Sequence, residues 1–143
     1  MSYRLGLRSL ARLRGVHRDL VAVVDRAITI TTVDFTVIEG LRSAARQRQL
    51  VAQGASQTLN SRHLTGHAVD LAPYVAGGVR WDWPLFFPIA EAMKTAARME
   101  GVEVRWGGNW NRLSQTSAPI TAADLSRSFP DGAHFELWRG DYP

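Results

Sequence analysis

The chain has 143 residues and a formal net charge of +4, and 45% of its residues are hydrophobic and 21% are charged. This length suits one domain with a hydrophobic core, and the composition excludes a disordered or fibrous protein. Because the chain has no cysteine, disulfides, thiolate metal ligands and a cysteine nucleophile are excluded.

Apolar residues recur at spacings of mostly three or four from Leu5 to Ile28, and Gly15 interrupts them. This pattern predicts two short amphipathic helices with a bend between them. Six arginines fall within the first 26 residues: Arg4, Arg8, Arg12, Arg14, Arg18 and Arg26. Positive charge favours an anionic partner such as nucleic acid, a membrane surface or an acidic wall polymer. We interpret these arginines as a solvated helix face in preference to a specific docking surface.

The next segment alternates predicted strands with one helix. β-Branched and aromatic residues predict a strand at 34–40, and Ser43 is a suitable N-cap for a helix that ends at Gly54. Residues 55–66 are rich in small polar residues and should form a loop. In residues 67–73 apolar and polar side chains alternate, which predicts a half-buried strand.

The C-terminal half is expected to contain another helix and two strands. A turn-rich connector leads to a helix that begins at Pro88, with this proline in its first turn, and stops at Gly101. A strand is predicted at 102–106, and the long connection after it contains one short helix from Thr121. The last strand covers 133–138. Because the elements show no regular βαβ alternation, they predict an α+β domain.

Two separate patches of the sequence carry possible metal ligands. The first patch, SRHLTGHAVDL, contains His63, His67 and Asp70. The second patch, DGAHFEL, contains Asp131, His134 and Glu136. The remaining histidine, His17, lies in the N-terminal helical region with no acidic cluster around it beyond Asp19.

Strand alternation places Asp70 and His134 on the sheet face opposite the core, and Gly66 permits a tight turn that would bring His63 over Asp70. Two imidazoles and one carboxylate form a ligand set that suits zinc. For either patch alone, a surface hydrogen bond between histidine and aspartate is the more common arrangement. A metal-binding pair of His63 and His67 ranks second, because its spacing needs a helix and the segment contains glycine and β-branched residues.

The two patches, in this order, resemble known signatures. SRHLTGHAVDL and DGAHFEL are similar to the S-x-H-x-x-G-x-A-x-D and D/E-x-x-H motifs of a zinc peptidase family. That family includes D-Ala-D-Ala carboxypeptidases and dipeptidases and the L-alanyl-D-glutamate endopeptidases of phage. The segments RSLARLRGVHRDLVAVVDRAI, VIEGLRSAARQRQLVAQGAS and RWGGNW resemble the phage endolysin branch, so the resemblance covers most of the chain.

The resemblance implies a set of site residues. It implies that zinc is bound by His63, Asp70 and His134. It places Asp131 at the position of the catalytic carboxylate, and Arg42 at the position of an arginine near the substrate carbonyl. His67 falls at a variable position and is not expected to bind the metal. The chain departs from the family at Asn109, where aspartate is common, and at Ala133, where proline is common.

The resemblance also implies a fold and an activity. The sheet should be small and mainly antiparallel, with helices packed on one face and the zinc site on the other. Residues 1–143 should form a single zinc peptidase domain without a separate wall-binding module, working as a monomer. The enzyme would hydrolyse the L-alanyl-D-glutamate bond of the peptidoglycan stem peptide and so lyse the host cell.

The resemblance also implies a mechanism, in which zinc and the polar residues of the site have separate functions. Zinc would lower the pKa of its water toward roughly 7, and Asp131 would pass a proton from that water to the leaving amine. Arg42 would stabilise the oxyanion or hold a substrate carboxylate; without the resemblance it would be interpreted as a surface arginine. Glu136 either orients a ligand imidazole or is solvated. The five tryptophans are most simply packing residues.

The place of action follows from what the sequence does not contain. It shows neither the apolar run of a signal peptide nor the roughly 18 apolar residues of a membrane span. We therefore expect synthesis in the host cytoplasm. An endolysin would reach the periplasmic wall after a holin permeabilises the inner membrane, and its positive charge would attract it to the anionic envelope.

Three other functions remain open. The same zinc site would serve a D,D-carboxypeptidase or dipeptidase, and a catalytically inactive binding module would keep the zinc fold without turnover. Nucleic-acid binding through the arginine-rich N-terminus is the third, and it predicts a DNA affinity that falls steeply with salt. We favour the endopeptidase and expect no nucleic-acid partner.

Overall fold

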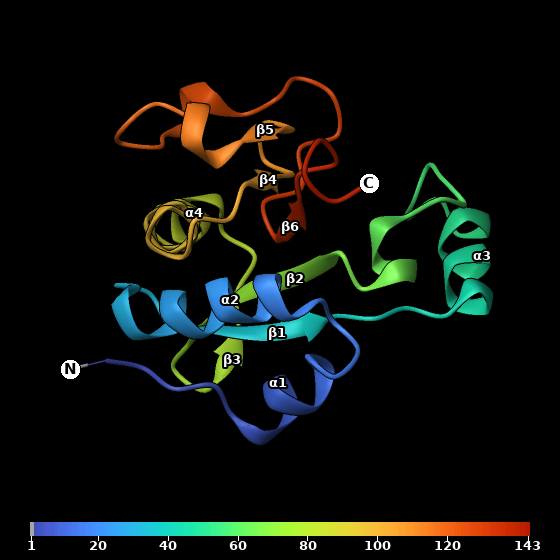
Figure 1. The fold of residues 1–143 in the computed structure, drawn as a ribbon, viewed down its shortest axis with the longest axis horizontal. Helices are drawn as coiled ribbons and strands as arrows, with labels where there is room; N and C mark the ends of the chain where they lie inside the picture. The colour runs from blue at the N-terminus through green and yellow to red at the C-terminus, as the bar shows by residue number, and fades with distance from the viewer. Residues whose placement is uncertain (1) are drawn as a thin grey trace.

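The computed structural model describes residues 2–143, which form a six-stranded sheet with four α-helices. Five strands follow the order β1-β2-β6-β4-β5, and β3 pairs with β2 off this path. Every pairing is antiparallel, which confirms the predicted α+β class (Figure 1). The strands are β1 (Phe35–Glu39), β2 (Ala68–Val75), β3 (Gly78–Val79), β4 (Val104–Trp106), β5 (Asn111–Arg112) and β6 (His134–Leu137).

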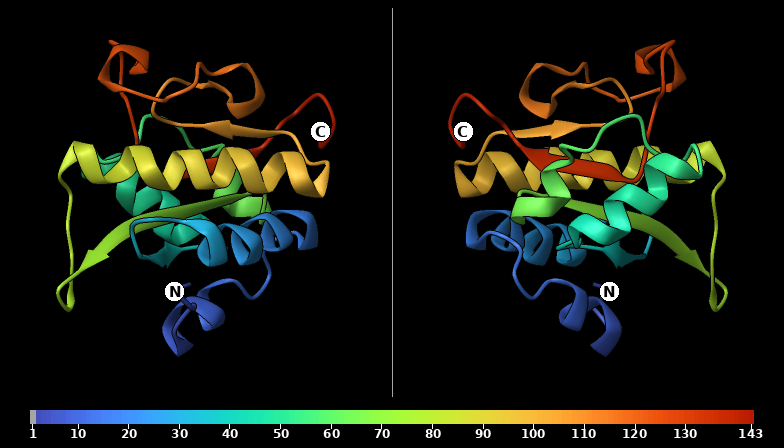
Figure 2. Two further views of the ribbon diagram at one scale, coloured as in Figure 1. Left: turned by 90° about the vertical axis from the view of Figure 1, so that its left-hand side faces the viewer. Right: turned by 90° about the vertical axis from the view of Figure 1, so that its right-hand side faces the viewer.

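Two of the helices cover one face of this sheet, and the other two lie at its edge and beyond its end. The helices are α1 (Leu7–Arg12), α2 (Arg18–Ile30), α3 (Ala44–Ala52) and α4 (Trp83–Glu100), with short 3-10 helices at Arg62–Thr65, Leu113–Gln115 and Ala122–Asp124. α2 and α4 pack against each other and cover one face (Figure 2), whereas α3 stands beyond the end of β1 (Figure 1). Among residues 2–143, no helix combines the length and apolarity needed to cross a lipid bilayer.

One hydrophobic core fills the space between the sheet and the helices α2 and α4. Phe135 of β6 lies opposite Val69 of β2 on one side and opposite Trp106 of β4 on the other. These three side chains therefore point to the same face of the sheet, which is the core face. All of them are fully buried. The alternate residues of the same strands therefore point to the opposite face, where the candidate ligands were expected.

The helix α1 protects the free edge of β1. The Val37 amide donates to Ser9 Oγ at 2.9 Å, and Arg12 Nη1 donates to the Val37 carbonyl at 3.0 Å. These contacts satisfy backbone groups that an edge strand would otherwise present to other chains. Arg12 therefore has a structural role although it is exposed, as Arg4, Arg8, Arg14 and Arg18 also are.

Two turn and cap predictions are confirmed by the backbone. Gly15 separates α1 from α2 and adopts a left-handed conformation with φ of 83°. Ser43 caps α3, because its side chain accepts a hydrogen bond from the Arg46 amide at 3.1 Å. Thr121 likewise caps the predicted short helix, which is a 3-10 turn.

The predicted start of α4 is wrong. The helix begins at Trp83 and has Pro84 in its first turn, so Pro88 lies inside the helix. The apolar stripe that packs on the core already includes Phe86, and burying it extends the helix toward the N-terminus. Pro88 is tolerated near the helix start, where the only lost bond would have reached the carbonyl of residue 84.

The segment after β2 also differs from the predicted connector. β2 continues to Val75 and forms a hairpin with β3 through Ala76 and Gly77. Both turn residues have positive φ, 53° and 82°, as a two-residue hairpin turn requires. Alanine is rare in this conformation, so the turn-rich composition of the segment did not indicate a hairpin turn that begins at Ala76.

Candidate metal centre and active site

Asp70 and His134 face each other across two neighbouring strands. They form a directly opposed pair in the register of β2 and β6, on the face away from the core. His134 Nδ1 lies 3.3 Å from Asp70 Oδ1. Adjacent antiparallel strands place opposed Cβ atoms about 5 Å apart, so this pairing alone brings the two side chains together.

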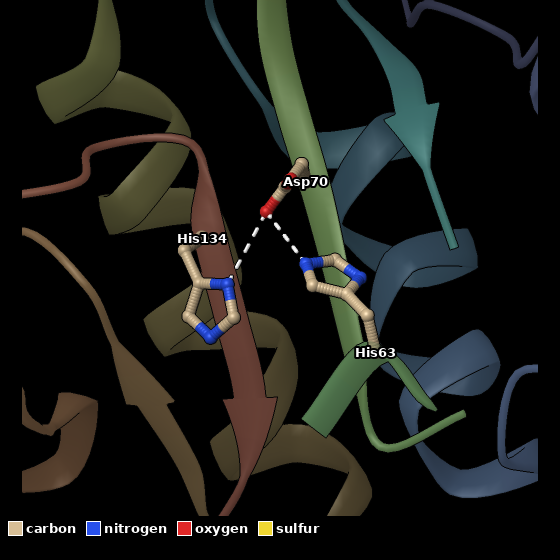
Figure 3. A group of neighbouring side chains, drawn as sticks. All are labelled: His63, Asp70 and His134. Carbon is tan, nitrogen blue, oxygen red and sulfur yellow. Dashed lines mark hydrogen bonds and ion pairs between the residues drawn. The ribbon is translucent and has the colours of Figure 1, made fainter. Parts of the chain in front are cut away.

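His63 reaches the same carboxylate from the 3-10 helix before β2. Ser61 caps this helix by accepting from the His63 amide at 3.2 Å, and Gly66 ends it with φ of 74°. A Cβ on Gly66 would overlap the Gly15 carbonyl oxygen, so the turn needs glycine for space as well as for conformation. His63 Nε2 lies 3.1 Å from Asp70 Oδ1 (Figure 3).

These three residues form one compact donor set. Their ligand atoms all lie within 4.8 Å of one another, and among residues 2–143 this is the single group of at least three such side chains that can hold a metal ion. Figure 3 shows the two imidazoles converging on the Asp70 carboxylate from opposite sides. His67 is not part of the group: its Nδ1 lies 2.6 Å from Thr65 Oγ1, and its ring packs beside His17.

The outer nitrogen of each imidazole has its own acceptor. His63 Nδ1 donates to the Gly40 carbonyl at 2.8 Å, and His134 Nε2 donates to Glu136 Oε1 at 2.9 Å. These bonds fix the ring orientations and direct the other nitrogen of each ring toward Asp70. Glu136 is buried and is therefore not the solvated strand residue that the sequence left as one alternative.

Charge is concentrated in this cluster. Burial alone would raise the pKa of Asp70, but hydrogen bonds from His134 and His63 outweigh it and hold that pKa well below its usual range. Burial would lower the pKa of His134, but its bonds to Asp70 and Glu136 raise it to about 10. Burial would raise the pKa of Glu136, but the bond from His134 and the positive charges of His134, Arg105 and Arg62 together outweigh it and lower that pKa.

Asp131 borders the same cavity from the loop before β6. This cavity has a volume of about 660 Å³ and is also lined by the three candidate ligands. Desolvation and the negative charge of Asp70 raise the pKa of the Asp131 carboxyl. The Asp131 amide donates to the Gly107 carbonyl at 2.8 Å, and a Cβ on Gly107 would collide with the Asp131 backbone. Gly107, the first glycine of RWGGNW, thus helps to position Asp131.

Arg42 lies at the other side of the cavity and is almost fully buried, with 8% of its side chain exposed. Its guanidinium binds both carboxylate oxygens of Glu39, at 2.6 and 2.9 Å, and donates to Gln47 Oε1 at 2.7 Å. Nη2 also lies 3.7 Å from Asp70 Oδ2. Arg42 is therefore a fixed cation beside the donor set and not a surface arginine.

The cavity is also lined by residues that the sequence does not single out, among them Arg105, Trp110 and Arg139. The Trp110 ring lies 5.5 Å from the His134 ring, and its backbone has a positive φ of 54°. Of the tryptophans expected to pack, Trp106 is fully buried in the core. In the sequence, the one feature that could have indicated Arg105 and Trp110 as site residues is the motif RWGGNW, of which they are the first and last residues.

A family model described as phage L-alanyl-D-glutamate peptidase matches residues 1–138 of this chain. The chain belongs to the phage L-alanyl-D-glutamate peptidase family. It is therefore a peptidase, and the predicted resemblance to this branch is confirmed.

Individual relatives extend this result over almost the whole chain. The L-alanyl-D-glutamate peptidase of Escherichia phage T5 is 33% identical over 141 residues, which are 96% of this chain and 99% of that protein. The L-alanyl-D-glutamate peptidase of Listeria phage A118 is 32% identical over 79 residues, 55% of this chain and 27% of that one.

A solved structure shares the fold. The crystal structure of the Serratia marcescens L-Ala D-Glu endopeptidase ChiX matches with a TM-score of 0.82 and 46% sequence identity. The match covers 98% of this chain and 94% of that chain. The predicted α+β fold of this family is thereby confirmed.

Proposed function

We propose that this family member is a zinc-dependent endopeptidase that hydrolyses the L-alanyl-D-glutamate bond of the peptidoglycan stem peptide. The observation that carries the proposal is the convergence of His63, Asp70 and His134 within 4.8 Å in a cavity bordered by Asp131. The names of the phage relatives and of the Serratia enzyme support the choice of bond.

The donor set fits zinc. It offers two imidazole nitrogens and one carboxylate oxygen, the three-ligand arrangement of catalytic zinc sites. The outer nitrogens already donate to Gly40 and Glu136, so the inner nitrogens, which face Asp70, are the atoms that would bind zinc as neutral ligands once any proton on them is displaced. When bound there, zinc would supply Lewis-acid polarisation of the scissile carbonyl and a lowered pKa for water.

Asp131 is proposed as the proton carrier. A carboxyl with a raised pKa is suited to accept a proton from the attacking water and to return it to the leaving nitrogen. It remains in contact with solvent at the cavity mouth, so it is accessible to a substrate. Its position in the loop is fixed by Gly107, on the side of the cavity next to His134.

Arg42 is proposed to stabilise negative charge on the substrate carbonyl oxygen. Its guanidinium is held by Glu39 and Gln47 and needs no reorganisation when a substrate binds. Because Glu39 already neutralises much of its charge, the expected contribution is smaller than that of an unpaired arginine.

The setting of the reaction is proposed from charge and family. A net charge of +4 favours contact with the anionic wall and envelope. We also propose that the enzyme works as a monomer and reaches the wall after a holin opens the inner membrane.

Digestion of purified Gram-negative peptidoglycan tests the proposed bond. Zinc-loaded protein should create new N-terminal glutamate, identified by mass spectrometry of the released termini. Release of free D-alanine would instead support a D,D-carboxypeptidase. A protein that binds zinc tightly but cleaves nothing would support a binding module.

A further inference from the structure

A small side cavity opens from the candidate active site along the sheet. It has a volume of about 270 Å³ and is called the arginine annex here; its lining is Arg105, Trp110, Glu136, Trp138 and Arg139. Four of these residues, all except Trp138, also line the main cavity, so the two spaces are continuous. Glu136 is two residues beyond His134 on β6, which places the annex roughly 7 Å along the strand from a candidate metal ligand.

Arg139 carries an uncommitted positive charge at this annex. Within residues 2–143, its guanidinium takes part in none of the side-chain hydrogen bonds or ion pairs, and the residue is exposed. Arg105, in contrast, donates to the Trp110 carbonyl at 3.0 Å and stacks over the Trp110 ring. Arg139 is therefore the cation that remains available for an incoming anion.

The backbone that carries Arg139 is firmly held. Arg62 is buried and donates from Nη2 to the carbonyls of Leu137 at 3.1 Å and Tyr142 at 2.6 Å. The Tyr142 amide donates to the Trp138 carbonyl at 2.9 Å and closes the turn that contains Arg139. Since both ends of the turn are fixed, the backbone of Arg139 is held at the annex, and its side chain lines the cavity.

The local charge balance favours an anion. Glu136 is the one carboxylate in the annex lining, and it is already engaged with His134 at 2.9 Å and with Arg105 at 3.8 Å. Arg62 and Arg139 add positive charge near it. The rings of Trp110 and Trp138 provide apolar walls that limit competing water.

We propose that the arginine annex is a carboxylate-binding subsite in which Arg139 pairs with the free carboxylate of the residue after the scissile bond. This inference rests on the proposed function. A glutamate at that position has two carboxyl groups; one continues the peptide and the other is free, within about 6 Å of the scissile carbonyl. That reach matches the spacing between His134 and the annex.

The test compares two stem peptides that differ only at this carboxylate, which is free in one and amidated in the other. The parent protein should cleave the free acid with a kcat/KM about tenfold higher, mainly through KM. Arg139→Gln should reduce this preference to about twofold or less. Arg8→Gln, on α1, removes the same charge far from the annex and should keep the full preference. Equal preference in the parent and Arg139→Gln would overturn the proposal.

A binding experiment separates this inference from the proposed function. Calorimetry would measure the affinity of zinc-loaded protein for the peptide that begins with D-glutamate and for its amidated form, neither of which contains a scissile L-alanyl bond. Tighter binding of the acid by the parent, lost in Arg139→Gln, supports the subsite even if no hydrolysis occurs. Equal binding of acid and amide by the parent overturns the subsite, whereas failure to hydrolyse either stem peptide overturns the proposed function.

Discussion

Glu136 Oε1 accepts a hydrogen bond from His134 Nε2 at 2.9 Å, and both residues are buried on the same face of β6. The strand period of two places them side by side, so the acceptor of the outer nitrogen is built into the same strand as the candidate ligand. Such an acceptor fixes the tautomer and raises the basicity of the ligating nitrogen.

Removal of this acceptor should weaken metal binding without removing a ligand. We expect Glu136→Ala to lower zinc affinity about 10- to 100-fold, measured by competition with a coloured chelator. Glu136→Gln keeps an oxygen acceptor and should lose less. Glu100→Ala, in α4, is the control and should bind zinc like the parent protein, since Glu100 pairs with Arg26 away from the cavity. Unchanged affinity in Glu136→Ala would contradict the orienting role.

Asp131 should separate metal binding from catalysis. Asp131→Asn removes the proton carrier and keeps the size of the side chain, so zinc affinity should stay within about threefold of the parent protein. The rate of peptide hydrolysis should fall about 10²- to 10⁴-fold. A variant that binds zinc and hydrolyses at the parent rate would eliminate Asp131 as the proton carrier.

Arg42 should tolerate little change. Arg42→Lys cannot bind both oxygens of Glu39 and Gln47 at the same time, because lysine lacks the planar fork of the guanidinium. We expect kcat to fall about tenfold or more, with a smaller change in KM. Arg48→Lys on the exposed side of α3 is the matched control. A change in KM alone would assign Arg42 to substrate binding.

Metal-free protein should lose stability at alkaline pH. The pKa of His134 is raised to about 10 in the folded protein, against about 6.5 in an unfolded chain. The folded state therefore holds this proton more tightly, and its stabilising effect is complete below about pH 6.5 and is lost as the pH rises through 10.

Thermal unfolding of chelator-treated protein checks this expectation. The Tm should fall by at least about 5 °C between pH 6.5 and pH 10. His134→Gln has no proton to lose at this position, so its Tm should fall less over the same range. Equal falls in the two proteins would show that other groups cause the alkaline loss.

Two glycines with the same backbone conformation should differ in their need for space. Gly54 and Gly66 have φ of 76° and 74°, but a Cβ on Gly54 meets no atom within 4 Å, whereas one on Gly66 overlaps Gly15. Gly54→Ala should cost about 1–2 kcal/mol from conformation alone. Gly66→Ala should cost about 1–3 kcal/mol more, measured by urea unfolding. Equal losses would mean that the chain relaxes around Gly66.

The sequence predicts those features of the site that depend on local periodicity. Alternation along β2 and β6 places Asp70 and His134 on one face, and the structure shows them directly opposed. Gly66 marks the turn that brings His63 back to Asp70. Each of these inferences needs only a few neighbouring residues, and the order of the two motifs adds the resemblance to the family.

Features that depend on contacts distant in sequence were not predictable in the same way. The bond from His63 to the Gly40 carbonyl joins residues 23 positions apart, and Arg62 binds a carbonyl 80 positions away. The backbone of Arg139 is positioned by that contact, so the residues next to Arg139 in the sequence do not indicate a function in binding. The start of α4 was misplaced for a related reason, because burial of Phe86 outweighs the local preference of Pro88.

We expect cleavage to require one zinc ion held by His63, Asp70 and His134. The most direct test is to measure the release of N-terminal glutamate from peptidoglycan by chelator-treated protein while zinc is added back. No glutamate should be released without zinc, and the rate should saturate at one zinc per chain. A full rate in the absence of zinc, or full recovery in Asp70→Ala at the same zinc concentration, would contradict it.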